Sequence, residues 1–166
     1  MICPVCGYQN LQGEDNCENC GADLRTADIP APGSRFERAL LNQPLGGLAP
    51  PRAMSVGPTT SAAQAVEQMR ADGSGAVVVV SDDRVVGIFT ERDALQKLAA
   101  IPLDGVTIDQ VMTLDPVVLR TDDSVAVAIH KMAVGGFRHI PLVDGGTPVA
   151  IITAHDVFRY ILDLLE

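Results

Sequence analysis

Short apolar runs and longer amphipathic runs alternate along the chain from residue 44 onward, and this pattern occurs twice. The apolar runs Val77 to Val80 and Ile140 to Val143 have the length and the β-branched content of buried strands. Each is followed by a polar turn, a second apolar run and then an amphipathic run. We therefore predict the order helix, strand, strand, helix in each copy.

The two copies are related by an offset of 63 residues without a gap. The matched pairs include Ser61 with Ser124, Met69 with Met132, Gly73 with Gly136, Thr90 with Thr153 and Asp93 with Asp156. One copy is too small for a good core, whereas two copies packed through their apolar sheets suffice. We predict an α/β (α+β) fold with a first repeat at 44–100 and a second at 107–165.

Each second strand ends in Thr-x-x-Asp at the start of a helix, as Thr90 with Asp93 and as Thr153 with Asp156. Free backbone N–H groups and the positive end of a helix dipole meet at such a junction, so it can receive a phosphate. The same spacing is close to that of a capping box, in which the two side chains only close the helix end. Both interpretations stay open from the local sequence.

All four cysteines lie within the first twenty residues, in two Cys-x-x-Cys-Gly hooks formed by Cys3 with Cys6 and by Cys17 with Cys20. Two such hooks give a tetrahedral four-thiolate site, the closed arrangement of structural zinc. We predict a short zinc ribbon at 1–24, with the N–H groups of the following glycines donating to sulfur. An iron site of the rubredoxin type has similar hooks but usually a longer segment between them.

Residues 25–43 are rich in proline and form a predicted linker with a short helix from Ser34 to Leu41. Ser34 and Glu37 have capping-box spacing at the start of that helix. The helix is expected to pack on the domain that follows.

The net charge of -9 argues against nucleic-acid binding, which requires clustered Lys and Arg. The sequence shows no signal peptide and no apolar run long enough to cross a membrane, so we expect a cytoplasmic protein. The three histidines are scattered and the cysteines are assigned to metal, so no nucleophile–base constellation is visible. We therefore expect no enzymatic activity.

Residues of about 44–165 resemble a tandem pair of CBS domains, the Bateman module. The resemblance is carried by the entry segment Val111–Val117, by the strand Arg138–Val143 and by the two Thr-x-x-Asp junctions. The first copy departs from it at 75–78, where Gly-Ala-Val-Val replaces Arg-His-Ile-Pro. Ala150 stands where the family has the glycine that Gly87 keeps.

The resemblance implies a pseudo-twofold pair with two clefts between the repeats, a homodimer, and a regulatory module that binds AMP, ADP, ATP or S-adenosylmethionine. The aspartates would accept ribose hydroxyls and the threonines would donate to phosphate. The implied ligand-binding residues are Met54, Val77, Thr90, Asp93, Val117, Arg138, His139, Ile140, Thr153, His155 and Asp156.

Arg138, His139 and His155 could neutralise a phosphate, and we assign them to the second junction. We therefore predict tighter phosphate binding there than at the first junction. The alternative function is a zinc-dependent protein–protein adaptor, in which the CBS pair is only a dimerisation scaffold without a ligand. In both readings an unidentified protein partner is expected.

Overall fold

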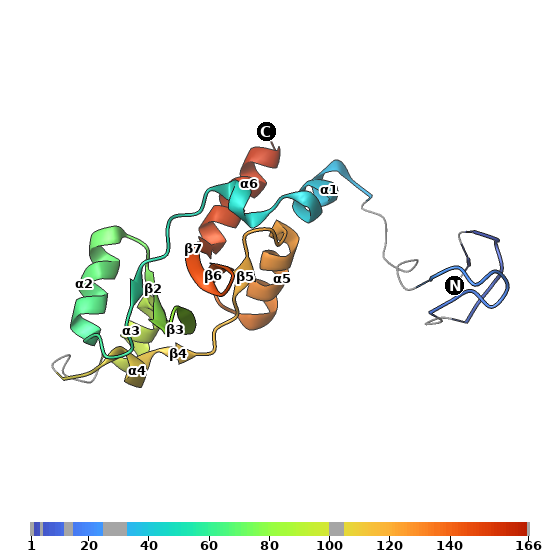
Figure 1. The fold of residues 1–166 in the computed structure, drawn as a ribbon. Helices are drawn as coiled ribbons and strands as arrows, with labels where there is room; N and C mark the ends of the chain where they lie inside the picture. The colour runs from blue at the N-terminus through green and yellow to red at the C-terminus, as the bar shows by residue number, and fades with distance from the viewer. Residues whose placement is uncertain (1, 4, 12–14, 25–32, 100–104, 166) are drawn as a thin grey trace. The chain divides into compact units, whose positions relative to one another are not determined.

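Each predicted repeat forms a strand hairpin between helices, as the hydrophobic pattern indicates (Figure 1). The computed structural model describes residues 2–3, 5–11, 15–24, 33–99 and 105–165. The chain divides into two units, Met1–Ala39 and Leu40–Glu166. Residues 25–32 of the predicted linker, with Pro30 and Pro32, and residues 100–104 lie outside the described residues.

The first repeat is preceded by α1 (Arg35–Asn42) and the 3-10 helix η1 (Leu45–Leu48). It then contains β1 (Ser55–Val56), α2 (Ala62–Asp72), β2 (Ala76–Ser81), β3 (Arg84–Thr90) and α3 (Glu91–Lys97). The second repeat contains α4 (Ile108–Val111), β4 (Thr113–Leu114), β5 (Leu119–Arg120), α5 (Val125–Gly135), β6 (His139–Asp144), β7 (Thr147–Thr153) and α6 (Ala154–Leu165).

Local sequence signals explain where several helices begin and end. Helix α1 has the predicted capping box, because Glu37 N–H donates to Ser34 Oγ (3.0 Å) and Ser34 N–H donates to Glu37 Oε2 (3.0 Å). Ser61 caps α2 by accepting from Gln64 N–H (3.2 Å). Gly73 ends α2 in the left-handed conformation with φ 65°, which glycine adopts without a steric penalty.

The strands form a four-stranded sheet in the order β1-β2-β3-β4 and a three-stranded sheet in the order β5-β6-β7. Strand β4 belongs to the second repeat by sequence but pairs with β3, with Leu114 opposite Gly87. The equivalent pairing in the other half is Arg52 opposite Ala150, one residue away from the gapless alignment. Ala53 N–H donates to the Val149 carbonyl (3.2 Å), whereas in the β3–β4 pairing it is Asp115, the counterpart of Arg52, that donates to the Val86 carbonyl (3.3 Å).

The two repeats exchange their entry helices. Leu45 of η1 is fully buried in the core that contains the strands of the second repeat. Ile108 and Val111 of α4 are buried in the core of the first repeat. The two cores therefore depend on each other, and Figure 1 shows the chain from η1 crossing from α6 to β1.

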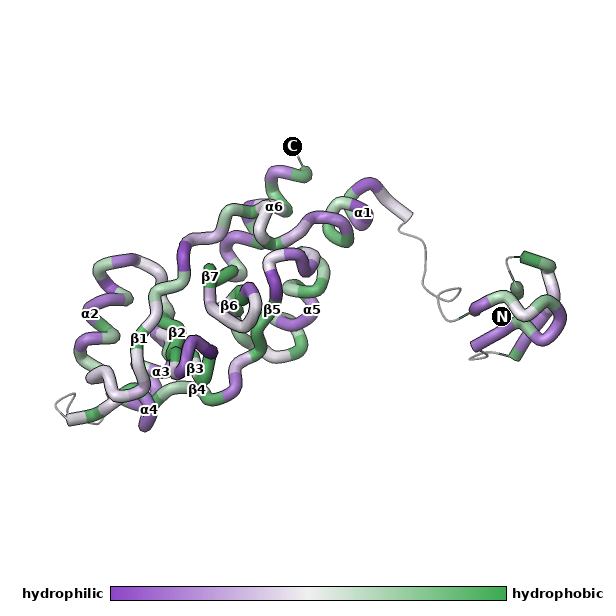
Figure 2. The backbone as a smooth tube through the Cα atoms, viewed as in Figure 1, coloured by the Kyte–Doolittle hydropathy of each residue, from purple (hydrophilic) through white to green (hydrophobic). Residues whose placement is uncertain are grey.

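A third core cluster lies between the sheets, as predicted from their apolar runs. Ala76, Val78 and Ile88 of the first repeat meet Ile151 of the second. Figure 2 shows hydrophobic colouring on β2 and on β6 and β7. Strand β2 is fully buried from Ala76 to Val79, as expected for a strand covered on both faces. Among the helices of the described residues, none is long and apolar enough to span a bilayer.

Candidate functional site

A cavity of about 580 Å³ lies at the first Thr-x-x-Asp junction and has walls from both repeats. Thr90 and Asp93 contribute the junction itself, and Val117 contributes the entry segment of the second repeat. Arg138 and His139, at the start of β6, complete the wall. A volume of this size is typical of small-molecule sites, so the cavity is the candidate ligand cleft.

Both junctions form helix caps. At the start of α3, Thr90 N–H and Thr90 Oγ1 donate to Asp93 Oδ2 (3.0 and 2.7 Å). At the start of α6, Thr153 N–H and Thr153 Oγ1 donate to Asp156 Oδ2 (2.9 and 2.6 Å). The capping interpretation is therefore confirmed in both copies, and each aspartate has one oxygen, Oδ1, outside its cap.

The second oxygen of Asp93 is also occupied. Thr113 Oγ1 donates to Asp93 Oδ1 (3.1 Å), and Lys97 Nζ forms an ion pair with the same oxygen (2.8 Å). Burial alone would raise the pKa of the Asp93 carboxyl, but Lys97 and Thr90 outweigh it and hold that pKa below its usual value. Asp93 is thus a buried, ionised and fully paired carboxylate.

Asp156 differs from Asp93 at this oxygen. Within the described part of the chain, no side chain or backbone group donates to Asp156 Oδ1. The offset of 63 places Tyr160 where the first repeat has Lys97, and Pro50 where it has Thr113. The second junction therefore keeps an acceptor that a ligand hydroxyl can use.

Arg138 and His139 lie between the two junctions. The Arg138 carbonyl accepts from Ala154 N–H (2.9 Å) at the start of α6, and His139 pairs with Thr153 in the β6–β7 hairpin. Their side chains nevertheless border the cavity at Thr90, so the structure does not restrict these basic groups to the second junction.

Burial disfavours the imidazolium form of His139 and so lowers its pKa. The neighbouring Arg138 guanidinium adds to this shift, whereas the Glu91 carboxylate opposes it. Arg92 also lines the cavity, and its Nη1 donates to the Gly136 carbonyl (3.0 Å).

The remaining implied residues offer mainly backbone or surface groups. Val77 and Ile140 are fully buried in the two cores, so their side chains are committed to packing. The Met54 carbonyl accepts from Val78 N–H (2.8 Å) and is used in the β1–β2 pairing. His155 is exposed on the first turn of α6.

Lys97 and Thr113 are site residues that the sequence analysis missed. The spacing of Asp93 and Lys97, four residues apart on a helix, is a signal for their ion pair. Nothing in the sequence places Thr113 beside Asp93, because they belong to different repeats.

The four cysteines converge in the N-terminal unit. Their sulfurs all lie within 4.8 Å of one another, with Cys3 Sγ 3.7 Å from Cys20 Sγ and Cys6 Sγ 3.6 Å from Cys17 Sγ. A tetrahedral zinc ion with Zn–S bonds of about 2.3 Å sets its sulfurs about 3.8 Å apart. The donor set therefore fits one tetrahedral thiolate-bound metal ion.

Backbone groups shape this metal centre. Gly7 and Gly21 have φ values of 73° and 71°, which close the two hooks. Their N–H groups donate to the carbonyl oxygens of Cys3 (2.9 Å) and Cys17 (2.8 Å), so the prediction that they donate to sulfur is wrong. The turn geometry favours the carbonyl, and the N–H that reaches sulfur is that of Val5 on Cys3 (3.4 Å).

Burial would raise the pKa of the Cys17 thiol, but N–H groups of Cys20 and Asn19 and the neighbouring thiols outweigh it and lower that pKa. The pKa of Cys20 is raised, although the Ala22 N–H opposes this, because the neighbouring thiols and burial disfavour its thiolate. A metal ion bound by all four sulfurs requires all four as thiolates.

A family model described as CBS domain matches residues 48–100 and 108–163. An uncharacterised 17.7 kDa protein of Acidianus ambivalens is 33% identical over 111 residues, which cover 66% of this chain and 67% of that protein. The CBS domain-containing protein CBSCBSPB5 of Arabidopsis thaliana is 29% identical over 117 residues, which cover 69% of this chain but only 21% of that longer protein.

Solved structures show the same arrangement. A CBS-domain-containing protein from Agrobacterium tumefaciens is 32% identical with a TM-score of 0.60, covering 65% of this chain and 88% of that one. CBSX2 from Arabidopsis thaliana is 26% identical with a TM-score of 0.64, covering 74% and 96%. A further structure of CBSX2 is a complex with AMP; it is 22% identical with a TM-score of 0.65, covering 75% and 99%.

Proposed function

Because this chain belongs to the CBS domain family, we propose that it is a regulatory module that binds an adenine nucleotide or a related adenosine derivative between its two repeats. The observation that carries the proposal is the cavity whose walls combine a Thr-x-x-Asp junction of one repeat with Val117 and Arg138 of the other. The AMP complex of CBSX2 supports the ligand class, and the proposed role is regulatory, without catalysis.

In the proposed complex, adenine packs on aliphatic side chains of the entry segments. Val117 lines the cavity at the first junction, and Met54 is its counterpart in the first repeat, 63 residues earlier. Asp156 Oδ1 accepts the ribose hydroxyls, since an ionised carboxylate can accept two hydrogen bonds at once. The phosphate lies at the helix start beside Thr153, where the positive end of the helix dipole favours an anion. Arg138 supplies the cation.

Mass spectrometry of the small molecules that copurify with the full-length chain tests the ligand class. The expected result is an adenosine-containing compound in stoichiometric or substoichiometric amount, released on denaturation. A copurifying ligand of another chemical class would overturn the proposal.

We also propose that the metal is a structural zinc ion held by Cys3, Cys6, Cys17 and Cys20. The unit buries little besides the metal ligands: Leu24, with Ala22 against it, joins Cys3 and Cys17 in its core. Because so small a core cannot stabilise a fold, the metal would supply the stability. The cysteines must stay reduced to bind zinc, and the cytoplasm keeps thiols reduced, so we propose a cytoplasmic location.

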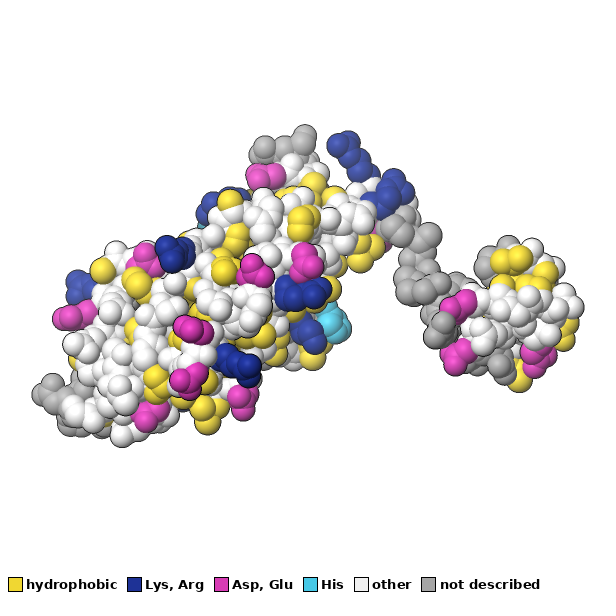
Figure 3. Space-filling model, viewed as in Figure 1, with side chains coloured by type: hydrophobic (Ala, Val, Ile, Leu, Met, Phe, Trp, Pro, Cys, Tyr) yellow, Lys and Arg dark blue, Asp and Glu magenta, His cyan; other side chains and the backbone are white. Residues whose placement is uncertain are grey.

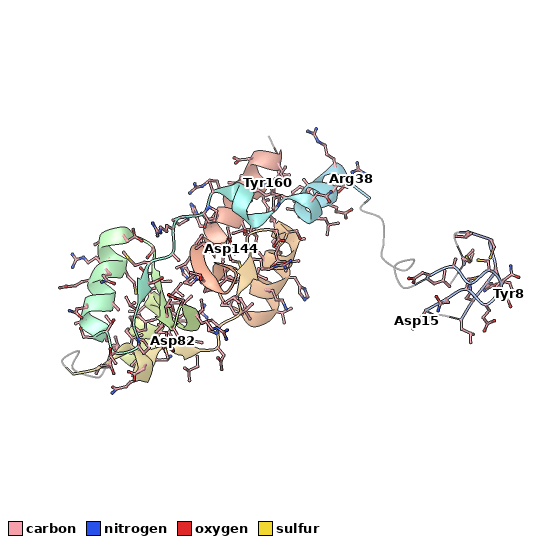
Figure 4. The ribbon with its side chains drawn as sticks, viewed as in Figure 1. Tyr8, Asp15, Arg38, Asp82, Asp144 and Tyr160 are labelled. Carbon is pink, nitrogen blue, oxygen red and sulfur yellow. The ribbon has the colours of Figure 1, made fainter. Side chains whose placement is uncertain are left out.

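A second candidate function is a protein adaptor, and the surface of the N-terminal unit favours it. Large apolar side chains are exposed there, at Ile2, Val5, Tyr8 and Leu11. Figure 3 shows apolar side chains on this unit, and Figure 4 shows Tyr8 and Asp15 on opposite sides of it. If these side chains lie together, they could form the apolar surface that a protein partner covers. A captured partner that is lost in both Tyr8→Ser and Cys17→Ser variants would support the adaptor.

A further inference from the structure

Lys97 connects three parts of the structure. Its Nζ lies 2.8 Å from Asp93 Oδ1, and it donates to the carbonyl oxygens of Val111 (2.7 Å) and Met112 (3.3 Å). These two carbonyls belong to the last residue of α4, the entry helix of the second repeat, and to the residue that follows it. The ammonium therefore ties α3 of the first repeat to the segment that leads into the second.

Thr113 strengthens the same connection. Its hydroxyl donates to Asp93 Oδ1 (3.1 Å), and its strand β4 pairs with β3, with Thr113 opposite Ile88. Asp115 and Val117 follow directly and line the cavity. One carboxylate oxygen thus holds the entry segment that forms a wall of the candidate cleft.

We call the cavity beside Thr90 and Asp93 the first cleft, and the junction at Thr153 and Asp156 the second cleft. We propose that Lys97 and Thr113 form a latch on the first cleft: their hydrogen bonds to Asp93 hold the entry segment of the second repeat in place. This inference rests on the proposed function, because it concerns how a ribose-bearing ligand uses that site. A ribose diol that binds Asp93 must take Oδ1 from Lys97 and Thr113. Since these donors hold α4 and β4 in place, ligand binding releases the entry segment.

The latch makes the two clefts unequal. Asp156 Oδ1 accepts no hydrogen bond from the described residues, so a diol binds there without displacing a donor. The first cleft binds the same ligand more weakly, because part of the binding free energy is used to break the latch. Ligand binding at the first cleft favours the entry segment released from Lys97 and Thr113 over the segment held by them. Binding at the first cleft therefore changes the conformation of the entry segment, whereas binding at the second cleft does not.

The test uses the full-length zinc-loaded chain carrying Asp156→Ala, so that binding at the second cleft does not obscure the first. Lys97→Met keeps the aliphatic stem and removes the ammonium, and Thr113→Val keeps the shape and removes the hydroxyl. Lys131→Met, which removes an exposed lysine from α5, is the matched control. AMP and 2′,3′-dideoxy-AMP are titrated by calorimetry, and hydrogen exchange over 111–117 is measured without ligand.

We expect both latch variants to bind AMP about fivefold more tightly than their parent, in line with the modest energy of a partly exposed ion pair. The affinity for the dideoxy analogue should stay unchanged, and exchange over 111–117 should be faster. Lys131→Met should match the parent in all three measurements.

Unchanged or weaker AMP binding in the latch variants would overturn the inference, and so would unchanged exchange over 111–117. If neither the wild-type chain nor any variant binds AMP, the proposed function fails. The hydrogen-exchange measurement still decides whether Lys97 and Thr113 hold the entry segment.

Discussion

Asp93 and Asp156 occupy the same position in the repeat but have different hydrogen-bond partners. Both close a helix with the preceding threonine, as the capping interpretation predicts. Only Asp93 is also paired at Oδ1, by Lys97 and Thr113. A cap and a ligand site are therefore not exclusive alternatives, because a carboxylate has two oxygens and the cap uses one.

We predict that Asp156→Ala weakens AMP binding more than Asp93→Ala does. Asp156 offers an unpaired oxygen, whereas both oxygens of Asp93 are already paired with groups of the chain. Asp93→Ala should instead lower the free energy of unfolding by about 1–2 kcal/mol, the usual cost of losing a helix cap. Calorimetric titration and urea unfolding of both variants measure the two effects. The reverse order of affinities would contradict the assigned roles.

The pKa of His139 predicts a pH dependence of stability. Burial lowers the pKa of this imidazole in the folded chain, so the folded state binds fewer protons than the unfolded state. Stability should therefore fall as the pH decreases from the unfolded pKa of about 6.5 toward the folded pKa. His139→Gln should reduce this loss between pH 7.5 and pH 5.5 in urea unfolding, and His130→Gln, at an exposed position, should not. An equal loss in wild type and His139→Gln would show that another group is responsible.

At the scale of elements, the sequence predicted most hairpins and helices because local signals and packing agree. Ser34, Ser61 and Gly73 all act at the helix ends where their residue types are favoured. The gapless alignment fails at the entry to the first repeat, where Arg52 takes the place expected for Pro51. The alignment alone could not show this shift, because the pairing forms between two different repeats.

Helix α6 carries an exposed apolar stripe formed by Phe158, Leu162 and Leu165. These positions follow i, i+4 and i+7 spacing and lie to one side of the helix face that carries the buried Val157. We predict that the stripe contacts a second copy in a homodimer. Leu162→Glu should convert the dimer to a monomer in light scattering coupled to size exclusion. A wild-type monomer, or a variant that stays dimeric, would refute the assignment.

We propose that the N-terminal unit depends on a bound metal ion rather than on a core of its own. Cys17→Ser removes one of four ligands, so we expect loss of the metal ion and unfolding of this unit. The melting temperature of the Leu40–Glu166 unit should stay within about 2 °C, because its cores contain none of the cysteines. Elemental analysis should find one zinc ion in the wild type, and a red iron protein would contradict the zinc assignment.

At the scale of the whole molecule, the exchanged entry helices join the two repeats into one body. Leu45 packs in the second core and Ile108 in the first. The same exchange brings Thr113 to Asp93 and Arg138 to the cavity beside Thr90. The sequence could identify the four cysteines and the two junctions, because each motif is local. It could not pair groups from different repeats, because their contacts follow from the crossing of the chain.

We propose that the clefts between the repeats bind an adenosine-type ligand. Titration calorimetry of the zinc-loaded full-length chain with AMP, ADP, ATP and S-adenosylmethionine measures this binding. We predict saturable binding of at least one of these ligands with a Kd below the millimolar range, weakened about tenfold or more by Asp156→Ala, as expected for loss of charge-assisted hydrogen bonds. Absence of saturable binding for all four ligands would contradict the claim.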